Sequence, residues 1–313
     1  MTKPVRVGII GAGGVGGYYG GLLARAGHPV SFLARGANLS ALREHGVIVR
    51  TSDDEWTSAV HASEDAHELS AGFGEGDLAL VTTKAYSLTE VAPAVIAFAE
   101  RGTTILPLLN GVEAAETLMK LGVPRERIIG GVTYISAVRA APGTIVRRTA
   151  AQRVIVGELA RGTSARVKEV AAIFENAGAQ GEASEDITVA LWQKFVFLSS
   201  IAAGCGLARL QLGQVRENPL GARLLDRAVR EAVAVGRARG VALRDDEEEQ
   251  TLSAIQSLPA GTEPSLLLDI RSGSRTEVDV LSGAISRFAT EAGLETPIHD
   301  TAALALAQPS TSR

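Results

Sequence analysis

The sequence predicts an α/β domain with a parallel, doubly wound sheet, followed by a domain built from helices alone. In the first part of the chain, short β-branched runs alternate with helical stretches, which is the pattern of a parallel sheet. A glycine-rich turn joins the first of these runs to the first helix. After residue 185 the sequence reads as helical throughout, so we expect domains at 1–185 and 186–313, a division that suits a chain of 313 residues.

The elements of the first domain are expected in this order. A β-branched strand at 5–10 ends in Gly11, and a helix with an amphipathic Ala/Leu pattern follows. Further strands are expected at 30–33, in a region of short strands at 47–60, at 78–81 and at 103–108. Two β-rich runs, 128–138 and 144–156, predict an antiparallel addition at the edge of the sheet. A helix at 165–177 then leads to the domain boundary.

The second domain is expected to be all-α. Its helical segments are expected at 187–203, 220–239, 247–257, 278–292 and 302–306. The acidic run at 245–249 is interpreted as a solvated first helical turn, where carboxylates favour the helix dipole. The apolar helices of this domain could also supply a homodimer interface.

Composition excludes several classes of function. The net charge of −4, without a polybasic block, makes nucleic acid an improbable partner. The single cysteine cannot form an intrachain disulfide, and the five histidines lack ligand spacing, so no metal site is expected. The longest nearly apolar stretch, 195–208, is shorter than the roughly 18 to 20 residues of a membrane span, and the N-terminus starts a strand rather than a signal peptide. We therefore expect a cytoplasmic protein without a membrane partner.

The glycine-rich turn has the pattern of a dinucleotide site. Gly11, Gly13 and Gly16 form Gly-x-Gly-x-x-Gly between a strand and a helix. This pattern allows a tight turn, a bare backbone against a pyrophosphate and close helix packing, which are the requirements of a Rossmann fold. The whole turn, Gly11, Ala12, Gly13, Gly14, Val15 and Gly16, is therefore expected to bind the cofactor.

Arg35 predicts which dinucleotide is bound. It follows the second strand, where NAD-binding folds place a carboxylate on the ribose, and residues 32–36 contain no carboxylate. An arginine there can pair with a 2′-phosphate, so NADP(H) is favoured over NAD. The alternative is an ordinary solvated arginine, and Arg43 is a weaker second candidate for the phosphate.

Two more polar residues follow strands of the expected sheet. Lys84 comes after the strand at 78–81 and Asn110 after the strand at 103–108, at the carboxyl ends where parallel sheets bind ligands. Asn110 precedes Gly111, and Asn-Gly is also a favoured turn pair, so Asn110 alone fits turn chemistry equally well.

A lysine in an apolar helix is the candidate for chemistry in the second domain. Lys194 is flanked by tryptophan, phenylalanine and valine. Either its stem reaches the surface, or its ammonium is held at a cleft where burial lowers its pKa towards that of a useful general acid. Further along, Ser265 is a plausible helix N-cap and Glu277 a plausible first-turn carboxylate.

Taken together, these blocks resemble the ketopantoate reductase (2-dehydropantoate 2-reductase) family over nearly the whole chain. The blocks are, in order, 11–17, Arg35, Lys84-Ala85-Tyr86, Asn110-Gly111-Val112-Glu113, Trp192-x-Lys194, Pro264-Ser265 and 275–279. The resemblance implies a Rossmann domain followed by a helical domain, with NADPH and substrate in the cleft between them. It implies that NADPH gives hydride to the carbonyl carbon of a 2-oxo acid. The leading candidate substrate is ketopantoate, which is reduced to pantoate.

The resemblance also implies roles for the residues outside the glycine turn. Lys194 would be the general acid, assisted by Asn110 and Glu277. Ser265 and Lys84 would contact the substrate. Lys84, Asn110 and Glu277 would also lie against the cofactor.

One part of the pattern departs from the family, which has asparagines four and eight residues after the lysine. This chain has Leu198 and Ala202 there, on the same helix face. A substrate hydroxyl against them would be unpaired, at a cost of about 1 to 3 kcal/mol. Either the substrate is a 2-oxo acid without the hydroxyl, or other residues, such as Arg271 or Arg275, hold ketopantoate.

Three other functions compete with the ketopantoate reading. One is reduction of a different 2-oxo acid on the same plan. Another is a β-hydroxyacid or opine-type dehydrogenase, and opine-type chemistry is disfavoured because His299 is the only histidine of the helical domain. The third is a non-catalytic NADPH-binding sensor, against which the retention of Lys194, Ser265 and Glu277 argues.

Overall fold

The computed structural model describes residues 4–307, which form two compact units. Within this range, the first unit comprises the chain up to Leu109 together with Glu113–Ile187. The second comprises Asn110–Val112 together with the chain from Thr188 onward. The three residues Asn110–Val112 thus belong to the second unit, whereas the domain limits expected from the sequence assign them to the first domain.

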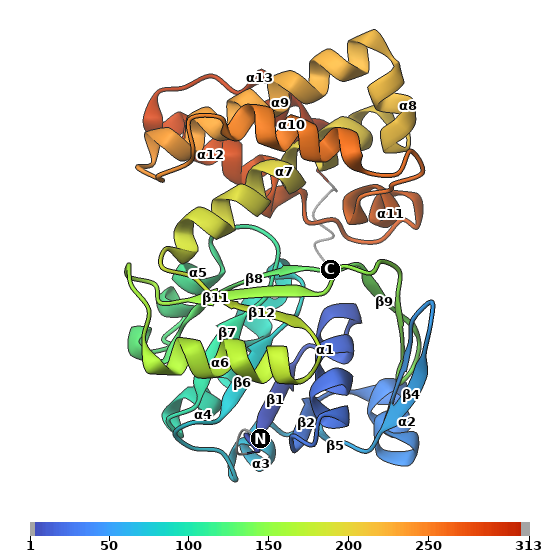
Figure 1. Ribbon diagram of the computed structural model, residues 1–313, viewed down its shortest axis with the longest axis vertical. Helices are drawn as coiled ribbons and strands as arrows, with labels where there is room; N and C mark the ends of the chain where they lie inside the picture. Colours follow the sequence, from blue (N-terminus) through green and yellow to red (C-terminus); the bar gives the residue numbers. More distant parts are fainter. Residues whose placement is uncertain (1–3, 308–313) are drawn as a thin grey trace. The chain divides into compact units, whose positions relative to one another are not determined.

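The first unit is built around a five-stranded parallel sheet with the order β5-β2-β1-β6-β7. Its strands are β1 (Val7–Ile10), β2 (Val30–Leu33), β5 (His61–Ser63), β6 (Leu78–Val81) and β7 (Thr104–Pro107). The connecting helices are α1 (Gly14–Arg25), α2 (Gly36–His45), α3 (Ala66–Ser70), the 3-10 turn η1 (Ala85–Ser87) and α4 (Leu88–Glu100). The predicted parallel sheet is therefore confirmed (Figure 1). The chain adds β2 and β5 on one side of β1, and then adds β6 and β7 on the other side. The order of strand addition therefore reverses at β1, and parallel sheets bind ligands at such a point.

A second sheet lies against the other side of α1. It has the order β4-β3-β10-β9, from β4 (Glu55–Ser58), β3 (Val47–Arg50), β10 (Thr144–Arg147) and β9 (Ala137–Ala141). A Cβ on Gly20 would overlap Phe32 of the parallel sheet, and one on Gly21 would lie 2.6 Å from Val49 Cγ2 of the second sheet. The glycines of α1 thus let one helix pack closely between two sheets.

The antiparallel addition expected at the sheet edge is confirmed in part, because Ile128 forms a parallel bridge with Ile105 of the edge strand β7 and the Ile129 N–H donates to the Ile105 carbonyl at 3.0 Å. The runs at 128–138 and 144–156 do form antiparallel pairs, β9 with β10 and β8 (Gly130–Tyr134) with β11 (Arg153–Gly157), but these belong to two separate sheets. The reason is that β10 also pairs in parallel with β3, which draws this hairpin over α1. In the third sheet β11 pairs with β12 (Gln180–Ala183), a strand not expected from the sequence.

The remaining helices of the first unit border these strands. They are α5 (Ala114–Lys120), the 3-10 turn η2 (Arg125–Arg127) and α6 (Ala165–Asn176). Helix α6 packs on β11 and β12, and Ser164 caps it by accepting the backbone N–H of Val167. These contacts complete the cover of the third sheet.

The second unit contains helices and no strand among its described residues, which confirms the all-α expectation. Its helices are α7 (Ile187–Ala208), α8 (Leu212–Glu217), α9 (Pro219–Ala238), α10 (Glu247–Ser257), α11 (Ser265–Arg271), the 3-10 turn η3 (Val278–Val280), α12 (Ser282–Ala292) and α13 (Pro297–Ala305). Asn218 caps α9 by accepting the backbone N–H of Leu220 at 2.8 Å, and Pro219 occupies the first turn. Its core is formed around Trp192, Phe195 and Phe288.

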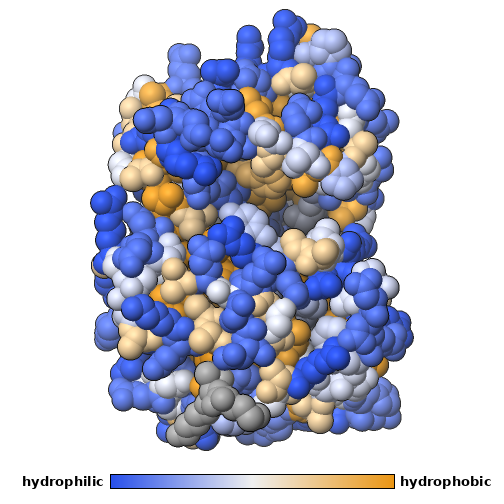
Figure 2. Space-filling view, viewed as in Figure 1, coloured by the Kyte–Doolittle hydropathy of each residue, from blue (hydrophilic) through white to orange (hydrophobic). Residues whose placement is uncertain are grey.

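Helix α7 is the single described helix whose length and hydropathy would also suit a membrane span. Within its most apolar window, 61% is buried inside the protein. Trp192 and Phe195 of α7 pack edge to face at 5.3 Å between ring centroids in the core of the second unit. Figure 2 shows hydrophilic residues spread over the face drawn. Helix α7 is therefore a core helix.

Candidate active site

The glycine turn between β1 and α1 leaves room for a ligand at one position in particular. Gly11 has φ +112°, and a Cβ there would lie 2.6 Å from the backbone nitrogen of Thr83. A Cβ on Gly16 would overlap the hydroxyl of Thr82, which donates to the Gly11 carbonyl at 2.8 Å. Gly13, by contrast, has nothing within 4 Å of the position a Cβ would take. Gly11 and Gly16 are thus required by the turn itself, whereas Gly13 faces open space.

The amino end of α1 fits a phosphate group. Its N-cap is Gly13, which supplies no side-chain cap, and its first turn contains no acidic residue. The first hydrogen bond of the helix runs from the Gly17 N–H to the Gly13 carbonyl at 2.8 Å, so the amides of Gly14, Val15 and Gly16 precede the helical ladder. The buried hydroxyl of Thr83, beside Gly11, has no hydrogen-bond partner among the described residues. Backbone N–H groups at a helix N-terminus, together with a hydroxyl that can donate a hydrogen bond, can bind the oxygens of a pyrophosphate.

Arg35 lies at the end of β2, the position predicted to bind the 2′-phosphate, but its guanidinium is already paired with the carboxylate of Glu90. It follows β2 as the N-cap of α2, and its Nη1 donates to Glu90 Oε1 of α4 at 2.8 Å. Both side chains are mostly exposed, at 67% and 62%. Sequence reasoning missed Glu90, because the carboxylate comes from a helix 55 residues away rather than from the end of β2. The second candidate, Arg43, donates to the carbonyl of Ala62 at 2.9 Å and is engaged in the fold.

Two further residues of the turn region lie as follows. Ala12 packs against the core of the first unit, and its carbonyl accepts from Asn38 Nδ2 at 3.4 Å. Lys84 follows β6 as the N-cap of η1 and is partly buried. Lys84 and Gly11 thus both follow strands at the carboxyl edge of the parallel sheet, and β1 and β6 are neighbours there.

In the second unit, Asn110 joins a lysine to a carboxylate. Lys194 Nζ donates to Asn110 Oδ1 at 3.2 Å, and Asn110 Nδ2 donates to Glu277 Oε2 at 3.2 Å. Glu277 is buried, with 5% of its surface exposed. Burial lowers the pKa of Lys194 to about 8, and the negative charge of Glu277 opposes that shift. The three residues therefore form one hydrogen-bonded chain ending in a weakly acidic ammonium.

Asn110 reaches this chain through a turn whose geometry is required. Leu109 is buried in the first unit, whereas Asn110–Val112 belongs to the second, where Val112 packs on the core. Gly111 has φ +88°, and a Cβ there would lie 3.0 Å from the carbonyl of Val280. The Asn-Gly pair is thus both a tight turn and the means of placing an amide between Lys194 and Glu277.

The other residues expected in the second unit lie on neighbouring helices. Ser265 is the first residue of α11 and is exposed, and the N-cap is Pro264, so Ser265 is not the cap that its position suggested. Glu277 is the N-cap of η3 but makes no side-chain cap bond there. Both residues are therefore available for roles other than helix capping.

The residues around Lys194 on α7 are apolar. Leu198 packs partly buried against the core, and Ala202 is inside it with 1% exposed. Arg271, considered as a hold for ketopantoate, pairs with Glu263 and also donates to the Arg209 carbonyl at 3.3 Å. Its guanidinium thus ties α11 to the end of α7.

His299 is placed for structure rather than chemistry. It is completely buried, its Nε2 lies 3.0 Å from the carbonyl of Ala228, and burial lowers its pKa to about 4. Such an imidazole is neutral at physiological pH and has no access to a substrate. This placement removes the His-Asp pair that opine-type chemistry would need.

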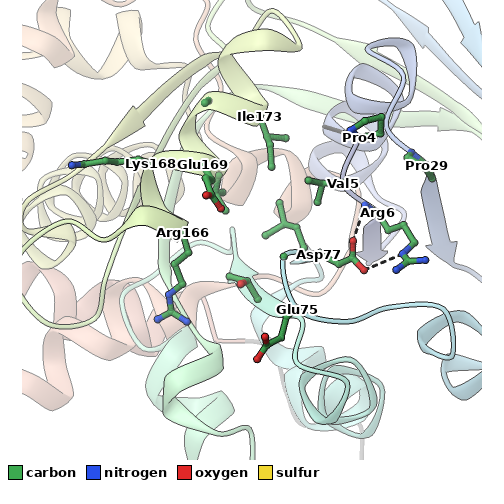
Figure 3. Close-up of a pocket in the computed structure, with 15 residues that line it drawn as sticks. Pro4, Val5, Arg6, Pro29, Glu75, Asp77, Arg166, Lys168, Glu169 and Ile173 are labelled. Carbon is green, nitrogen blue, oxygen red and sulfur yellow. Dashed lines mark hydrogen bonds and ion pairs between the residues drawn. The ribbon is translucent and has the colours of Figure 1, made fainter. Parts of the chain in front are cut away.

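One cavity of the first unit lies away from this edge of the sheet. Its volume is about 900 Å³, and Figure 3 shows it between α6 and the residues that begin the strands, among them Val5, Arg6 and Asp77. Arg6 Nε and Asp77 Oδ2 are paired at 3.0 Å on its wall. Because the strands are parallel, this cavity lies at their amino ends, opposite the glycine turn, and has no part in the dinucleotide site.

Comparisons with known proteins agree with the sequence blocks. Family models described as ketopantoate reductase PanE/ApbA and its C-terminal part match residues 7–161 and 186–309. A 2-dehydropantoate 2-reductase of Halobacterium salinarum is 31% identical over 96% of this chain and 97% of its own. An uncharacterised oxidoreductase of Bacillus subtilis is 28% identical over 94% and 95%. A crystal structure of a 2-dehydropantoate 2-reductase from Geobacter metallireducens superposes with a TM-score of 0.88 at 28% identity, covering 96% and 99%. The chain therefore belongs to the ketopantoate reductase family and is an NADP-dependent oxidoreductase.

Proposed function

We propose that this protein uses NADPH to reduce a 2-oxo acid to the 2-hydroxy acid, with ketopantoate to pantoate as the leading reaction. The observation that carries the proposal is the chain Lys194–Asn110–Glu277, which holds an ammonium of lowered pKa in a partly buried position. Reduction of a carbonyl needs one hydride and one proton, and this ammonium can supply the proton.

The residues of the first unit that would hold NADPH are those that fit its phosphates. The amides of Gly14, Val15 and Gly16 would bind the pyrophosphate, and Arg35 would bind the 2′-phosphate. Lys84 would contact the substrate and the cofactor. When bound, NADPH supplies the hydride. The rest of the catalytic work belongs to side chains of the protein.

Lys194 would act as the general acid. Its Nζ gives a proton to the substrate oxygen as hydride reaches the carbonyl carbon, so the C=O becomes CH–OH and the lysine is left neutral until it takes a proton from water. Asn110 Oδ1 orients the ammonium, and Asn110 can do so in one direction only, because its NH₂ group donates to Glu277. The buried carboxylate of Glu277 favours the charged form of Lys194.

The pH dependence follows from this assignment. Lys194 is protonated below a pKa of about 8, and the acid form is the one that reduction consumes. We expect kcat for reduction to be constant at pH 6–7 and to fall about tenfold per pH unit above 8, while the reverse oxidation rises over the same range. Initial rates from pH 6 to 10 at saturating NADPH measure this. A reduction rate that increases through pH 8 would contradict an acid role for Lys194.

The substrate is tested by direct comparison. Leu198 and Ala202 offer no hydrogen bond along the α7 face that follows Lys194, and this favours a 2-oxo acid without a hydroxyl as the second candidate. NADPH oxidation is measured with ketopantoate and with branched 2-oxo acids of the same carbon skeleton that lack the hydroxyl, with NADH alongside. A higher kcat/KM for ketopantoate supports the leading reaction. A higher value for the deoxy acids assigns the second candidate, and saturable NADPH binding without turnover of any 2-oxo acid would mean a sensor.

We also infer a setting for this activity. The curated relatives named above are 2-dehydropantoate 2-reductases or an oxidoreductase, and α7 is a core helix, which supports work on a small molecule in the cytoplasm without a membrane partner. A homodimer through the helical unit stays a prediction, measurable by light scattering.

A further inference from the structure

The ion pair between Arg35 and Glu90 spans the strand edge that carries the glycine turn. Arg35 follows β2, and Glu90 lies in the first turn of α4, which follows β6 and η1. β2 and β6 are the two neighbours of β1 in the sheet, and β1 ends in the glycine turn. A contact of 2.8 Å between Arg35 Nη1 and Glu90 Oε1 therefore joins the two sides of the dinucleotide edge.

We propose that Glu90 sets how strongly the protein discriminates NADPH from NADH, by competing with the 2′-phosphate for the Arg35 guanidinium. The inference rests on the proposed function, in which Arg35 binds that phosphate. A guanidinium can pair with a carboxylate or with a phosphate. The N–H group of Arg35 Nη1 that donates to Glu90 cannot donate fully to a phosphate at the same time.

The competition acts on one cofactor only. The 2′-phosphate of NADPH must either take Arg35 Nη1 from Glu90 or bind the remaining N–H groups beside it, and in both cases the carboxylate stays close to a phosphate of the same sign. NADH carries a neutral hydroxyl at the same position, so the Arg35–Glu90 pair can remain closed. Glu90 thus opposes NADPH binding and leaves NADH binding unchanged.

Exposure determines the size of the effect. Both side chains are more than half exposed, so water and salt screen the pair. We expect the substitution Glu90→Gln to lower the Kd of NADPH by about two- to fivefold at low salt, with a smaller change at about 1 M salt. The Kd of NADH should stay within about twofold.

The experiment is a double-mutant cycle on the full chain, with the Kd values of NADPH and NADH measured by calorimetry. The variants are Glu90→Gln, Arg35→Gln and the double substitution, with Glu100→Gln as control, since Glu100 ends the same helix and is exposed. The proposal expects Glu90→Gln to tighten NADPH alone, and to have no effect once Arg35 is replaced. Glu100→Gln should bind as the wild type does.

Each contrary result has a defined meaning. Unchanged or weaker NADPH binding in Glu90→Gln, equal tightening of both cofactors, or an undiminished effect without Arg35 overturns the proposal. If Arg35→Gln leaves NADPH binding unchanged, the 2′-phosphate assignment fails and the proposal fails with it. If the binding cycle behaves as expected but no 2-oxo acid is turned over, the proposed reaction fails while the role of Glu90 stands.

Discussion

Replacing Lys194 with alanine should reduce kcat for 2-oxo acid reduction by about 10²- to 10⁴-fold, the range that a positioned general acid contributes. The protein would then have to take the proton from water, and Asn110 would lose the donor that its Oδ1 accepts from. The Kd of NADPH should stay close to the wild-type value, because the phosphates of NADPH are assigned to the glycine turn and Arg35 rather than to Lys194. Stopped-flow or steady-state NADPH oxidation, with calorimetry for binding, measures both.

Stability must be separated from catalysis in this variant. Removing the ammonium takes away a positive charge that acts on the buried carboxylate of Glu277, so the melting temperature is measured alongside. Lys194→Met, which fills the same space, provides a second variant. Lys168→Ala on α6 is the matched control and should keep full activity. Turnover of Lys194→Met at the wild-type rate would rule out Lys194 as the acid.

Replacing Gly13 with alanine should weaken NADPH binding at least about tenfold without weakening the fold, because a Cβ would take the space through which the backbone approaches the pyrophosphate. Gly13 has φ −89° and ψ −160°, which alanine adopts freely, and nothing lies within 4 Å of the added Cβ. The melting temperature should therefore stay within a few degrees of the wild-type value. Calorimetric titration and a thermal melt of the same sample give the two values.

The glycines of the chain supply controls for this prediction. Gly72 also faces open space, without a left-handed φ, in a loop that precedes β6, so Gly72→Ala should change neither value. A Cβ on Gly14 would overlap the Ala137 carbonyl, so Gly14→Ala should lower the melting temperature itself. If Gly13→Ala binds NADPH as tightly as the wild type, the cofactor does not approach this turn closely.

Local pattern was sufficient for most of the fold. The strands at 30–33 and 78–81 coincide with β2 and β6, because β-branched and apolar residues there are bounded by polar turns. β12 was missed because its sequence, Gln-Gly-Glu-Ala, has no strand preference and is a strand only through pairing with β11. Helices α8 and α11 were also missed, because each has fewer than two full turns and so shows no helical period of apolar residues.

The sequence named candidate site residues but not the hydrogen bonds that connect them. The blocks named Lys194, Asn110 and Glu277, yet their hydrogen-bonded order depends on contacts between positions 84 and 167 residues apart. Glu90 could not be anticipated, since an exposed acidic residue in a first helical turn is ordinary and only the fold brings it to Arg35. Such long-range contacts are set by packing, which local pattern does not contain.

The segment Asn110–Val112 has a consequence for recombination between related genes. The polypeptide passes between the two units at Leu109, at Val112 and again at Ile187, so no single crossover keeps each unit intact. A chimaera joined at the last of these points would combine the lysine and the carboxylate of one parent with the bridging amide of the other. The helical half can therefore be exchanged only among parents that share this amide.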